Sequence, residues 1–168
     1  MRRNHRSFLS RAGVLLLASV GIACTDSVGP VPTATELTVL IDSASVHVWR
    51  SEGNAYNVSV PFTVMNSSGQ SLFYNGFCLT RWEKLVGVTW VVVGEMRCID
   101  TTHPLRRIFP YSSASFASGK GVGGPGVTVP DFAQPGTYRL VLHLYLDSQG
   151  RTQIPDDVAT SNTFQVMN

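Results

Sequence analysis

Charge is scarce in this sequence. Only 14% of its 168 residues are Asp, Glu, Lys or Arg, whereas about 25% is usual for a soluble globular chain. The formal net charge is +2, but four of the thirteen basic residues lie within the first 23 positions, which leaves nine basic against eleven acidic residues in the remainder. So little net charge gives no electrostatic footprint for nucleic acid, and we expect no nucleic-acid partner.

Sequence signatures of catalysis are also missing. The chain contains no G-x-S-x-G, H-E-x-x-H or C-x-x-C pattern, and Asp147, Asp156 and Asp157 lack the alternating spacing of a dedicated calcium loop. Residues 119–124 match G-x-G-x-x-G, but Pro125 and Gly126 follow where a nucleotide site requires a helix. We therefore expect no catalytic residue, no metal and no cofactor, and a surface loop at this stretch.

The N-terminus has the pattern of a secretory signal peptide over residues 1–23. An apolar run, AGVLLLASVGIA, occupies residues 12–23. Twelve helical residues rise about 18 Å, which is too short for a hydrocarbon core of about 30 Å. A basic segment before such a run is typical of export signals. The basic residues are Arg2, Arg3, Arg6 and Arg11.

The end of this run, Gly21-Ile22-Ala23-Cys24, resembles the lipobox of bacterial lipoproteins, although the family usually has leucine where Gly21 stands. The resemblance implies a diacylglycerol on Cys24, which would hold the protein stably on a membrane. Residues 24–35 would then form the lipidated cysteine and an extended tether, reaching roughly 34 Å over its last eleven residues. Thr25 stands where the family's inner-membrane retention signal has aspartate, so the resemblance favours the outer membrane of the cell envelope.

Three cysteines leave one unpaired in an exported protein. Lipidation of Cys24 would leave Cys78 and Cys98, for which an oxidising compartment favours a disulfide over free thiols or metal ligands. A hairpin turning at Val86 and Gly87 would place Cys78 opposite Glu95, so the pairing would need a bulge or a bend.

Alternation with period two predicts an all-β domain over residues 36–168. The clearest strands are residues 56–65 and 136–146, with further strands from residue 37, at 163–167, at 105–109, at 113–116 and at 126–129. About seven to nine short strands favour an antiparallel Greek-key β-sandwich, with a closed barrel as the alternative. Pro61 predicts an edge or a bulge. The two apolar faces comprise Val58, Val60, Phe62 and Val64, and Tyr138, Leu140, Leu142, Leu144 and Leu146.

Several stretches resemble bacterial immunoglobulin-like domains, which are common in secreted proteins and lipoproteins. They are residues 66–68, 82–85 with Trp90, 135–140 and 161–166. The best is Pro-Gly-Thr-Tyr-Arg-Leu, where Tyr138 suits a tyrosine corner whose hydroxyl bonds to the preceding loop. The resemblance implies the fold and says little about function, because sandwiches host many roles.

Exposed aromatic side chains are the remaining functional signal. Phe109 and Tyr111, preceded by Arg106 and Arg107, form a candidate binding loop, because arginine and aromatic side chains anchor protein interfaces. A plug beneath the sandwich is the alternative. Trp82 and Trp90 are expected to pack across their hairpin. His143, beside Arg139 and Tyr145, could contact a ligand or lie on an ordinary half-exposed strand face.

These patterns predict an exported, membrane-anchored lipoprotein of the cell envelope. Its immunoglobulin-like domain would be non-catalytic and would bind an unknown protein or envelope ligand, or serve envelope structure. A secreted β-sandwich proteinase inhibitor acting through residues 106–111 is one alternative. A hydrolase is the second, and it would need a pocket with converging polar groups.

Overall fold

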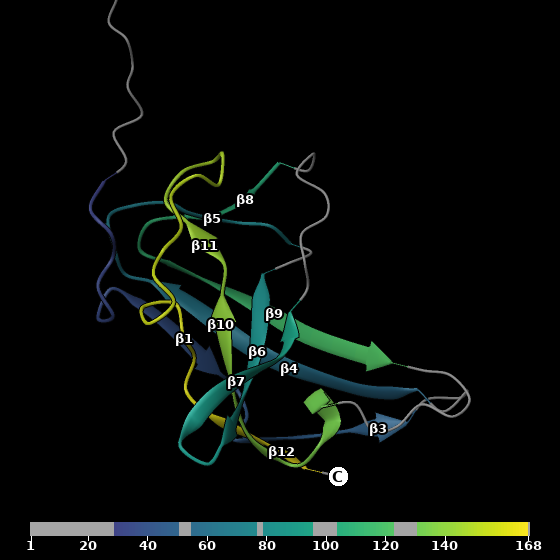
Figure 1. Ribbon diagram of the computed structural model, residues 1–168. Coiled ribbons are helices and arrows are strands. Elements are labelled where there is room, and N and C mark those ends of the chain that lie inside the picture. The colour runs from purple at the N-terminus through teal and green to yellow at the C-terminus, as the bar shows by residue number, and fades with distance from the viewer. Residues whose placement is uncertain (1–28, 51–54, 77–78, 96–103, 123–130, 168) are drawn as a thin grey trace, which may run out of the picture.

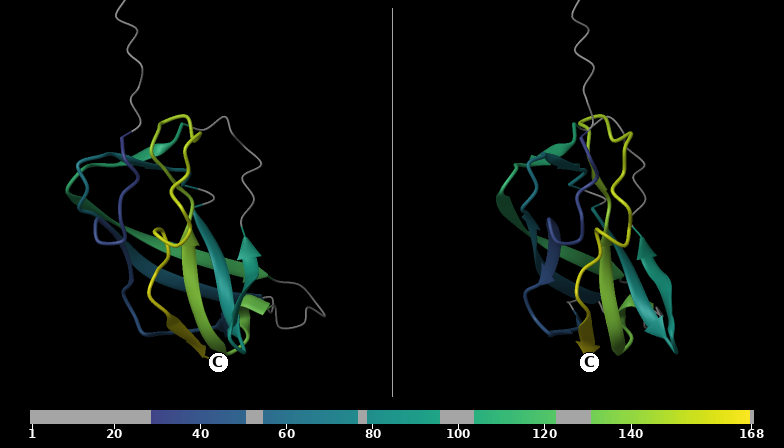
Figure 2. Two further views of the ribbon diagram at one scale, coloured as in Figure 1. Left: turned by 60° about the vertical axis from the view of Figure 1, so that its left-hand side comes forward. Right: turned by 90° about the vertical axis from the view of Figure 1, so that its left-hand side faces the viewer.

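The computed structural model describes residues 29–50, 55–76, 79–95, 104–122 and 131–167. These residues form strands that pack as two layers, with a smaller sheet at one end (Figures 1 and 2). The strands are β1 (Leu37–Ile41), β2 (Ser45–His47), β3 (Trp49–Arg50), β4 (Tyr56–Asn66), β5 (Leu72–Tyr74), β6 (Thr80–Val86), β7 (Thr89–Glu95), β8 (Arg106–Ile108), β9 (Ser112–Val122), β10 (Gly136–Leu142), β11 (Leu144–Tyr145) and β12 (Phe164–Met167).

The first layer is built around β4. This strand pairs antiparallel with β9 along its whole length, and on its other side with β1 and β3. Its side chains alternate between the core and solvent as the period-two pattern predicts. The expected strand at residues 56–65 is therefore confirmed, with the four side chains of its predicted apolar face buried.

Pro61 lies in this central strand, so the expectation of an edge or a bulge is wrong. The amide N–H of Asp42 donates to the carbonyl oxygen of Pro61 at 3.1 Å, so the polar groups of Pro61 face the side where the β1 ladder ends at Phe62. The β3 ladder pairs only residues 56 and 57. Proline fits because its missing donor faces the gap between these two ladders.

The second layer has the strand order β2-β12-β10-β6-β7. Its pairs are antiparallel apart from β12 with β2, which run parallel. The core between the layers contains large aromatic rings. Trp82 from β6 meets the rings of Tyr138 and Phe164 edge-on, with centroids 6.3 Å and 5.7 Å away. Burial on both inner faces establishes the all-β sandwich that the patterning predicts.

The small third sheet has the order β11-β5-β8 and covers one end of the sandwich (Figure 1). The chain enters at this same end, while the turn of the β6–β7 hairpin lies at the opposite end in all views (Figure 2). A short 3-10 helix, η1 (Asp131–Ala133), precedes β10 and contacts β7 and β4, and its Phe132 and Ala133 are buried.

The tyrosine corner is confirmed. The hydroxyl of Tyr138 lies 2.7 Å from the carbonyl oxygen of Asp131 and 2.6 Å from that of Gln134, and can donate its proton to either. Burial, followed by the nearby charge of Asp131, raises the pKa of Tyr138 to about 12. The hydroxyl therefore fastens η1 to β10 while keeping its proton.

The β6–β7 hairpin differs from the expected register. Val86 pairs with Thr89, so the turn is Gly87-Val88, and a bulge between Trp82 and Glu83 shifts the pairing by one further residue. Trp82 consequently faces Gly94 and enters the core, whereas Trp90 pairs with Leu85. The expectation that both tryptophans pack together as core residues is wrong, because the altered register separates them.

Much of the expected tether belongs to the folded domain. Pro32 is buried, and Thr33 forms a capped turn in which the Glu36 carboxylate accepts bonds from both the backbone N–H and the hydroxyl of Thr33. These bonds hold the pKa of Glu36 below its usual value. Because Pro32 is buried and Gln70 Nε2 donates to the Pro30 carbonyl, residues 29–35 lie against the sandwich and do not form an extended tether. The signal peptide, Cys24, Cys78, Cys98 and the expected strand at 126–129 lie outside the described residues.

Candidate functional site

The candidate loop forms an edge strand and the turn that follows it. Arg106 and Arg107 lie on β8, opposite Tyr74 and Phe73 of β5, and both are exposed. Ile108 points inward and is buried. The guanidinium carbon of Arg107 lies 4.2 Å from the centroid of the Phe109 ring, in cation–π contact. The loop is therefore an exposed surface rather than a plug beneath the sandwich.

The backbone of this loop is held rigidly by hydrogen bonds. The Phe109 carbonyl accepts bonds from Asn66 Nδ2 at 3.0 Å and from Ser112 Oγ at 2.7 Å. Tyr111 adopts a left-handed conformation with φ of 51°, and its N–H donates to the carbonyl of Ser68 at 3.3 Å. Phe109 is 56% exposed and Tyr111 is 78% exposed. A fixed backbone that displays free aromatic side chains loses little entropy on binding.

Asn66 is the residue of this site that sequence reasoning missed. It is buried, and its Nδ2 also donates to the Gln70 carbonyl at 2.7 Å. Its Oδ1 accepts from the Ser68 N–H at 3.1 Å and from Ser68 Oγ at 2.7 Å. The sequence Asn-Ser-Ser-Gly indicated only a turn, and its bond to Phe109, 43 residues away, carried no local signal.

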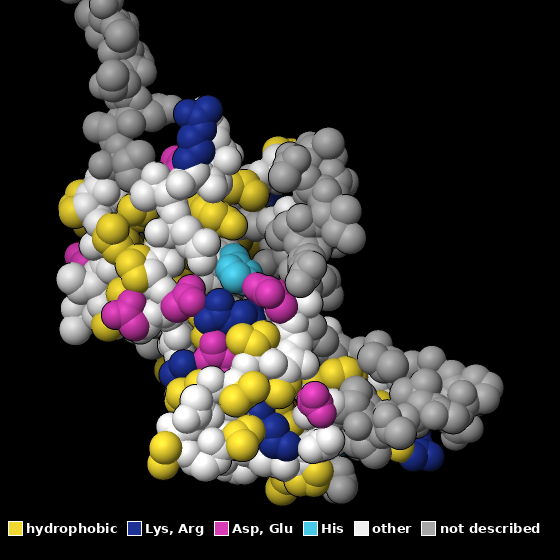
Figure 3. All heavy atoms as spheres, in the orientation of Figure 1, with side chains coloured by type: hydrophobic (Ala, Val, Ile, Leu, Met, Phe, Trp, Pro, Cys, Tyr) yellow, Lys and Arg dark blue, Asp and Glu magenta, His cyan; other side chains and the backbone are white. Residues whose placement is uncertain are grey.

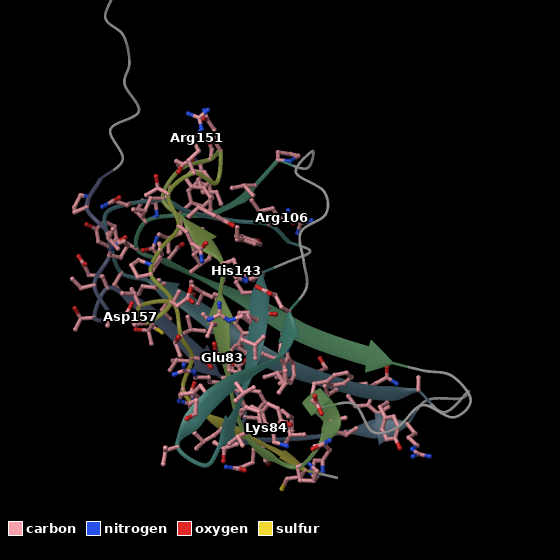
Figure 4. The ribbon with its side chains drawn as sticks, viewed as in Figure 1. Glu83, Lys84, Arg106, His143, Arg151 and Asp157 are labelled. Carbon is pink, nitrogen blue, oxygen red and sulfur yellow. The ribbon has the colours of Figure 1, made fainter. Side chains whose placement is uncertain are left out.

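A second cluster, the Glu83 network, lies on the outer face of the second layer. The Glu83 carboxylate is buried between two arginines, with Arg81 Nη2 at 2.8 Å from one oxygen and Arg139 Nη2 at 2.7 Å from the other. Arg81 also binds Asp156 at 2.8 Å. The guanidinium of Arg139 covers the Trp90 ring at 4.4 Å. Figures 3 and 4 show this charged band across the middle of the molecule.

His143 extends this band, but its side chain does not join Arg139 and Tyr145 in the candidate ligand-contacting triplet. Its Nε2 lies 3.6 Å from Glu95 Oε1, and its Nδ1 lies 3.4 Å from the Gln153 amide. Arg139 is engaged by Glu83, while Tyr145 lies on β11 in the small sheet. The structure therefore gives the three side chains different partners, and the ordinary strand-face interpretation of His143 fits better.

Two of the three aspartates, Asp147 and Asp156, have different partners. Asp147 accepts hydrogen bonds from the backbone N–H groups of Gln149, Arg151 and Thr152. Desolvation opposes ionisation, but these bonds together hold the pKa of Asp147 below its usual value. Asp156 binds Arg81. Within the described residues, no group of three or more His, Cys, Asp or Glu side chains could hold a metal ion.

Four exposed valines, which we call the valine hairpin, lie along the β6–β7 hairpin, whose turn is at the end away from the chain entry. Its four members are exposed by amounts from 43% for Val91 to 97% for Val88, and β7 is the last strand of its sheet among the described residues. Hydrophobic side chains gather over this lower part of the molecule in Figure 3. Sequence reasoning missed it by following aromatic residues. The members are Val86, Val88, Val91 and Val92.

Comparisons with known proteins give no family. No protein-family model matches the chain, and no curated protein matches it. In the part of the chain that the structure describes, no helix is long and apolar enough to cross a membrane.

Solved structures with similarity to the chain include three of low identity. A Northeast Structural Genomics Consortium target, SoR45, has 14% identity and a TM-score of 0.43, covering 77% of this chain and 84% of that one. The putative ApaA protein from Bordetella pertussis has 15% identity and a TM-score of 0.35, covering 65% and 78%. The DNA glycosylase AlkC from Pseudomonas fluorescens has 9% identity and a TM-score of 0.34, covering 79% and 31%. The fold assignment consequently rests on the strand pairing described above.

Proposed function

We propose that this protein is a lipid-anchored, non-catalytic protein of the bacterial cell envelope that presents its valine hairpin to a partner protein. The lipobox resemblance around Cys24 supports the anchor. The described chain begins at the end of the sandwich opposite the hairpin turn, which supports the direction of presentation (Figure 2). A protein held by its N-terminus in this way directs the hairpin away from the membrane.

The observation that carries the interaction is the exposure of apolar side chains on an edge strand. Natural edge strands are usually protected by charge, proline or a covering element, because their free N–H and C=O groups invite another strand. β7 instead carries Val91 and Val92 half-exposed, beside a turn whose Val88 is almost fully exposed. A partner that adds one apolar strand to β7 would use both the main-chain groups and these side chains.

The inhibitor alternative would use the loop at residues 106–111. That loop lies at the end where the chain enters, so a membrane anchor leaves a proteinase less room there than at the hairpin. A hydrolase would require a nucleophile beside its base, and the side chain of His143 contacts Glu95 and Gln153, neither of which is a hydroxyl or thiol nucleophile. Both considerations favour presentation of the hairpin.

The anchor is tested by the intact mass of the native protein from a membrane fraction. We expect the mass of residues 24–168 plus a diacylglycerol-type adduct. A mature protein that is cleaved elsewhere and recovered without lipid would contradict the anchor and favour a freely secreted inhibitor. An inhibition assay against a panel of serine and cysteine proteinases then tests that alternative directly.

The partner surface is tested by photo-crosslinking on whole cells. A photoreactive residue replacing Val91 should give one discrete adduct, and adding Val88→Lys to the same chain should remove it. The matched control places the photoreactive residue at Ser113, an exposed position on the outer face of β9. Equal crosslinking at both positions, or none at Val91 in membrane-anchored protein, would contradict a binding role for the hairpin.

A further inference from the structure

The turn at residues 109–111 lies directly beside the point where the chain enters the domain. Gln70 links the two, because its Nε2 donates to the carbonyl of Pro30 and its side chain lies against Gly29. In the same Asn66–Gln70 segment, Gly69 lies against the hydroxyl of Tyr111. The entry point and the exposed aromatic turn therefore form one corner of the molecule.

The chain between Cys24 and this corner is short. Five residue steps separate Cys24 from Gly29, and an extended chain advances at most about 3.3–3.6 Å per residue, or roughly 17 Å in all. A lipid on Cys24 holds that residue at the membrane surface, so the corner cannot move further from the bilayer than this reach. Residues 29–35 do not lengthen this connection, because the bond from Gln70 to Pro30 and the capped turn at Thr33 hold them in the folded domain.

The side chains at this corner have the chemistry of a membrane interface. Phe109, Tyr111 and Val31 are exposed large apolar or amphipathic residues. Arg106 and Arg107 are exposed on the adjoining strand, and Arg151 lies at the same end (Figure 4). Aromatic rings favour the headgroup region, and basic side chains near an anionic surface are attracted to it.

Two neighbouring carboxylates, Glu36 and Asp147, accept hydrogen bonds from neutral donors of their own turns and therefore keep their negative charge. Arg106, Arg107 and Arg151 exceed them by one positive charge. Arg107 stacks on Phe109, which keeps its charge beside the ring that would enter the interface.

We propose that Arg106, Arg107, Phe109 and Tyr111 dock the domain onto the anionic phospholipid surface that carries its anchor. This inference rests on the proposed lipidation of Cys24. Docking through this corner orients the sandwich end-on, with the valine hairpin pointing away from the bilayer.

The test uses the mature lipidated protein reconstituted into vesicles of phosphatidylethanolamine and phosphatidylglycerol, with a nitroxide quencher on the lipid headgroups. Tyr111→Trp places an indole in the corner, and the matched control Val88→Trp places one at the far hairpin turn. The quenching of the native tryptophans is measured in the unsubstituted protein and subtracted. We expect the added indole at position 111 to be quenched strongly and the one at position 88 to be quenched little.

Charge is tested by combining Tyr111→Trp with Arg106→Gln and Arg107→Gln. Two basic residues at roughly 1 kcal/mol each predict an approximately thirty-fold lower ratio of docked to free domain, and phosphatidylcholine vesicles should have a similar effect. Equal quenching at positions 111 and 88 in vesicle-bound protein would overturn the docking while leaving the anchor intact. Protein that lacks a lipid adduct and stays in the supernatant would overturn the anchor, and the docking with it. Stoichiometric proteinase inhibition by the vesicle-bound protein would show that the loop is free, and would also overturn the docking.

Discussion

Trp82 donates its indole N–H to the hydroxyl oxygen of Ser118 at 2.8 Å, and this bond joins the two layers of the sandwich. Trp82 lies on β6 and Ser118 on β9, and both are buried. Thr80 Oγ1 lies 2.6 Å from the same serine oxygen. A single small polar residue on β9 thus satisfies the only polar atom of the largest side chain in the core.

Ser118→Ala should lower the free energy of unfolding by about 1–3 kcal/mol, because it leaves the buried indole N–H without an acceptor. Urea denaturation followed by tryptophan fluorescence measures the change. Ser113→Ala, at an exposed position on the same strand, is the matched control and should alter stability by less than about 0.5 kcal/mol. Equal effects of the two substitutions would mean that the bond across the core contributes nothing specific.

Stability should fall at alkaline pH through Tyr138. Its pKa is raised to about 12 in the folded state, whereas an unfolded tyrosine ionises near about 10. Below pH 10 both states keep the proton. Between these two values the unfolded state alone releases it, so the free energy of unfolding declines by about 2–3 kcal/mol.

Denaturation curves at several pH values between about 9 and 12 measure this decline. Tyr138→Phe should remove it, and should also cost about 1–2 kcal/mol at neutral pH, because the Asp131 and Gln134 carbonyls lose their shared donor. Tyr111→Phe, at an exposed position, should keep the alkaline decline. If both variants behave alike, the buried tyrosine is not its source.

Glu83→Gln should destabilise the domain by about 2–3 kcal/mol, since it leaves Arg81 and Arg139 facing each other without their shared buried carboxylate. The expected loss is smaller than for a fully buried pair because both guanidinium groups keep some contact with water. The emission of Trp90, which Arg139 covers, should also change.

Thermal and urea unfolding of Glu83→Gln and of the control Glu95→Gln separate these roles. Glu95 is more exposed than Glu83, and its Oε1 lies 3.6 Å from His143 Nε2, so its substitution should cost less than about 1 kcal/mol. A loss at Glu83 no larger than at Glu95 would contradict a central role for the Glu83 network.

The hairpin register makes a prediction for the two remaining cysteines. Trp82 pairs with Gly94 and Arg81 with Glu95, so continuing this register by three residues would set position 78 opposite position 98. We expect a disulfide there, closing a 21-residue loop and contributing roughly 3 kcal/mol.

Alkylation and mass spectrometry of the native protein, with and without reductant, test this pairing. Neither thiol should react before reduction, both should react afterwards, and reductant should lower the melting temperature. The double variant Cys78→Ser, Cys98→Ser should melt at the reduced temperature with or without reductant. Two thiols that are alkylated in the unreduced protein would count against the disulfide.

Much of the fold could be predicted because period-two alternation is a local property of a strand. The buried faces of β4 and β10 and the hydroxyl bond of Tyr138 followed from patterns within a few residues. The hairpin register did not, because the bulge between Trp82 and Glu83 depends on how Trp82 enters a core formed by distant strands.

The candidate loop could be predicted from its residue types, but its position in the molecule could not. Arginine next to exposed aromatics indicates a binding surface in any fold. The tertiary structure brings Phe109 to Asn66, 43 residues away in the chain. It also brings Gln70, which lies next to this turn, to Pro30, 40 residues away.

By itself, the sequence determined which side chains of β4 and β10 form the buried faces, because alternation and hydrophobicity act along the chain. The tertiary structure decided which edges and faces stay open, since a strand's exposure depends on whether another strand, distant in sequence, lies beside it. The valine hairpin at one end and the arginine–aromatic corner beside Gly29 at the other are products of that second kind of information.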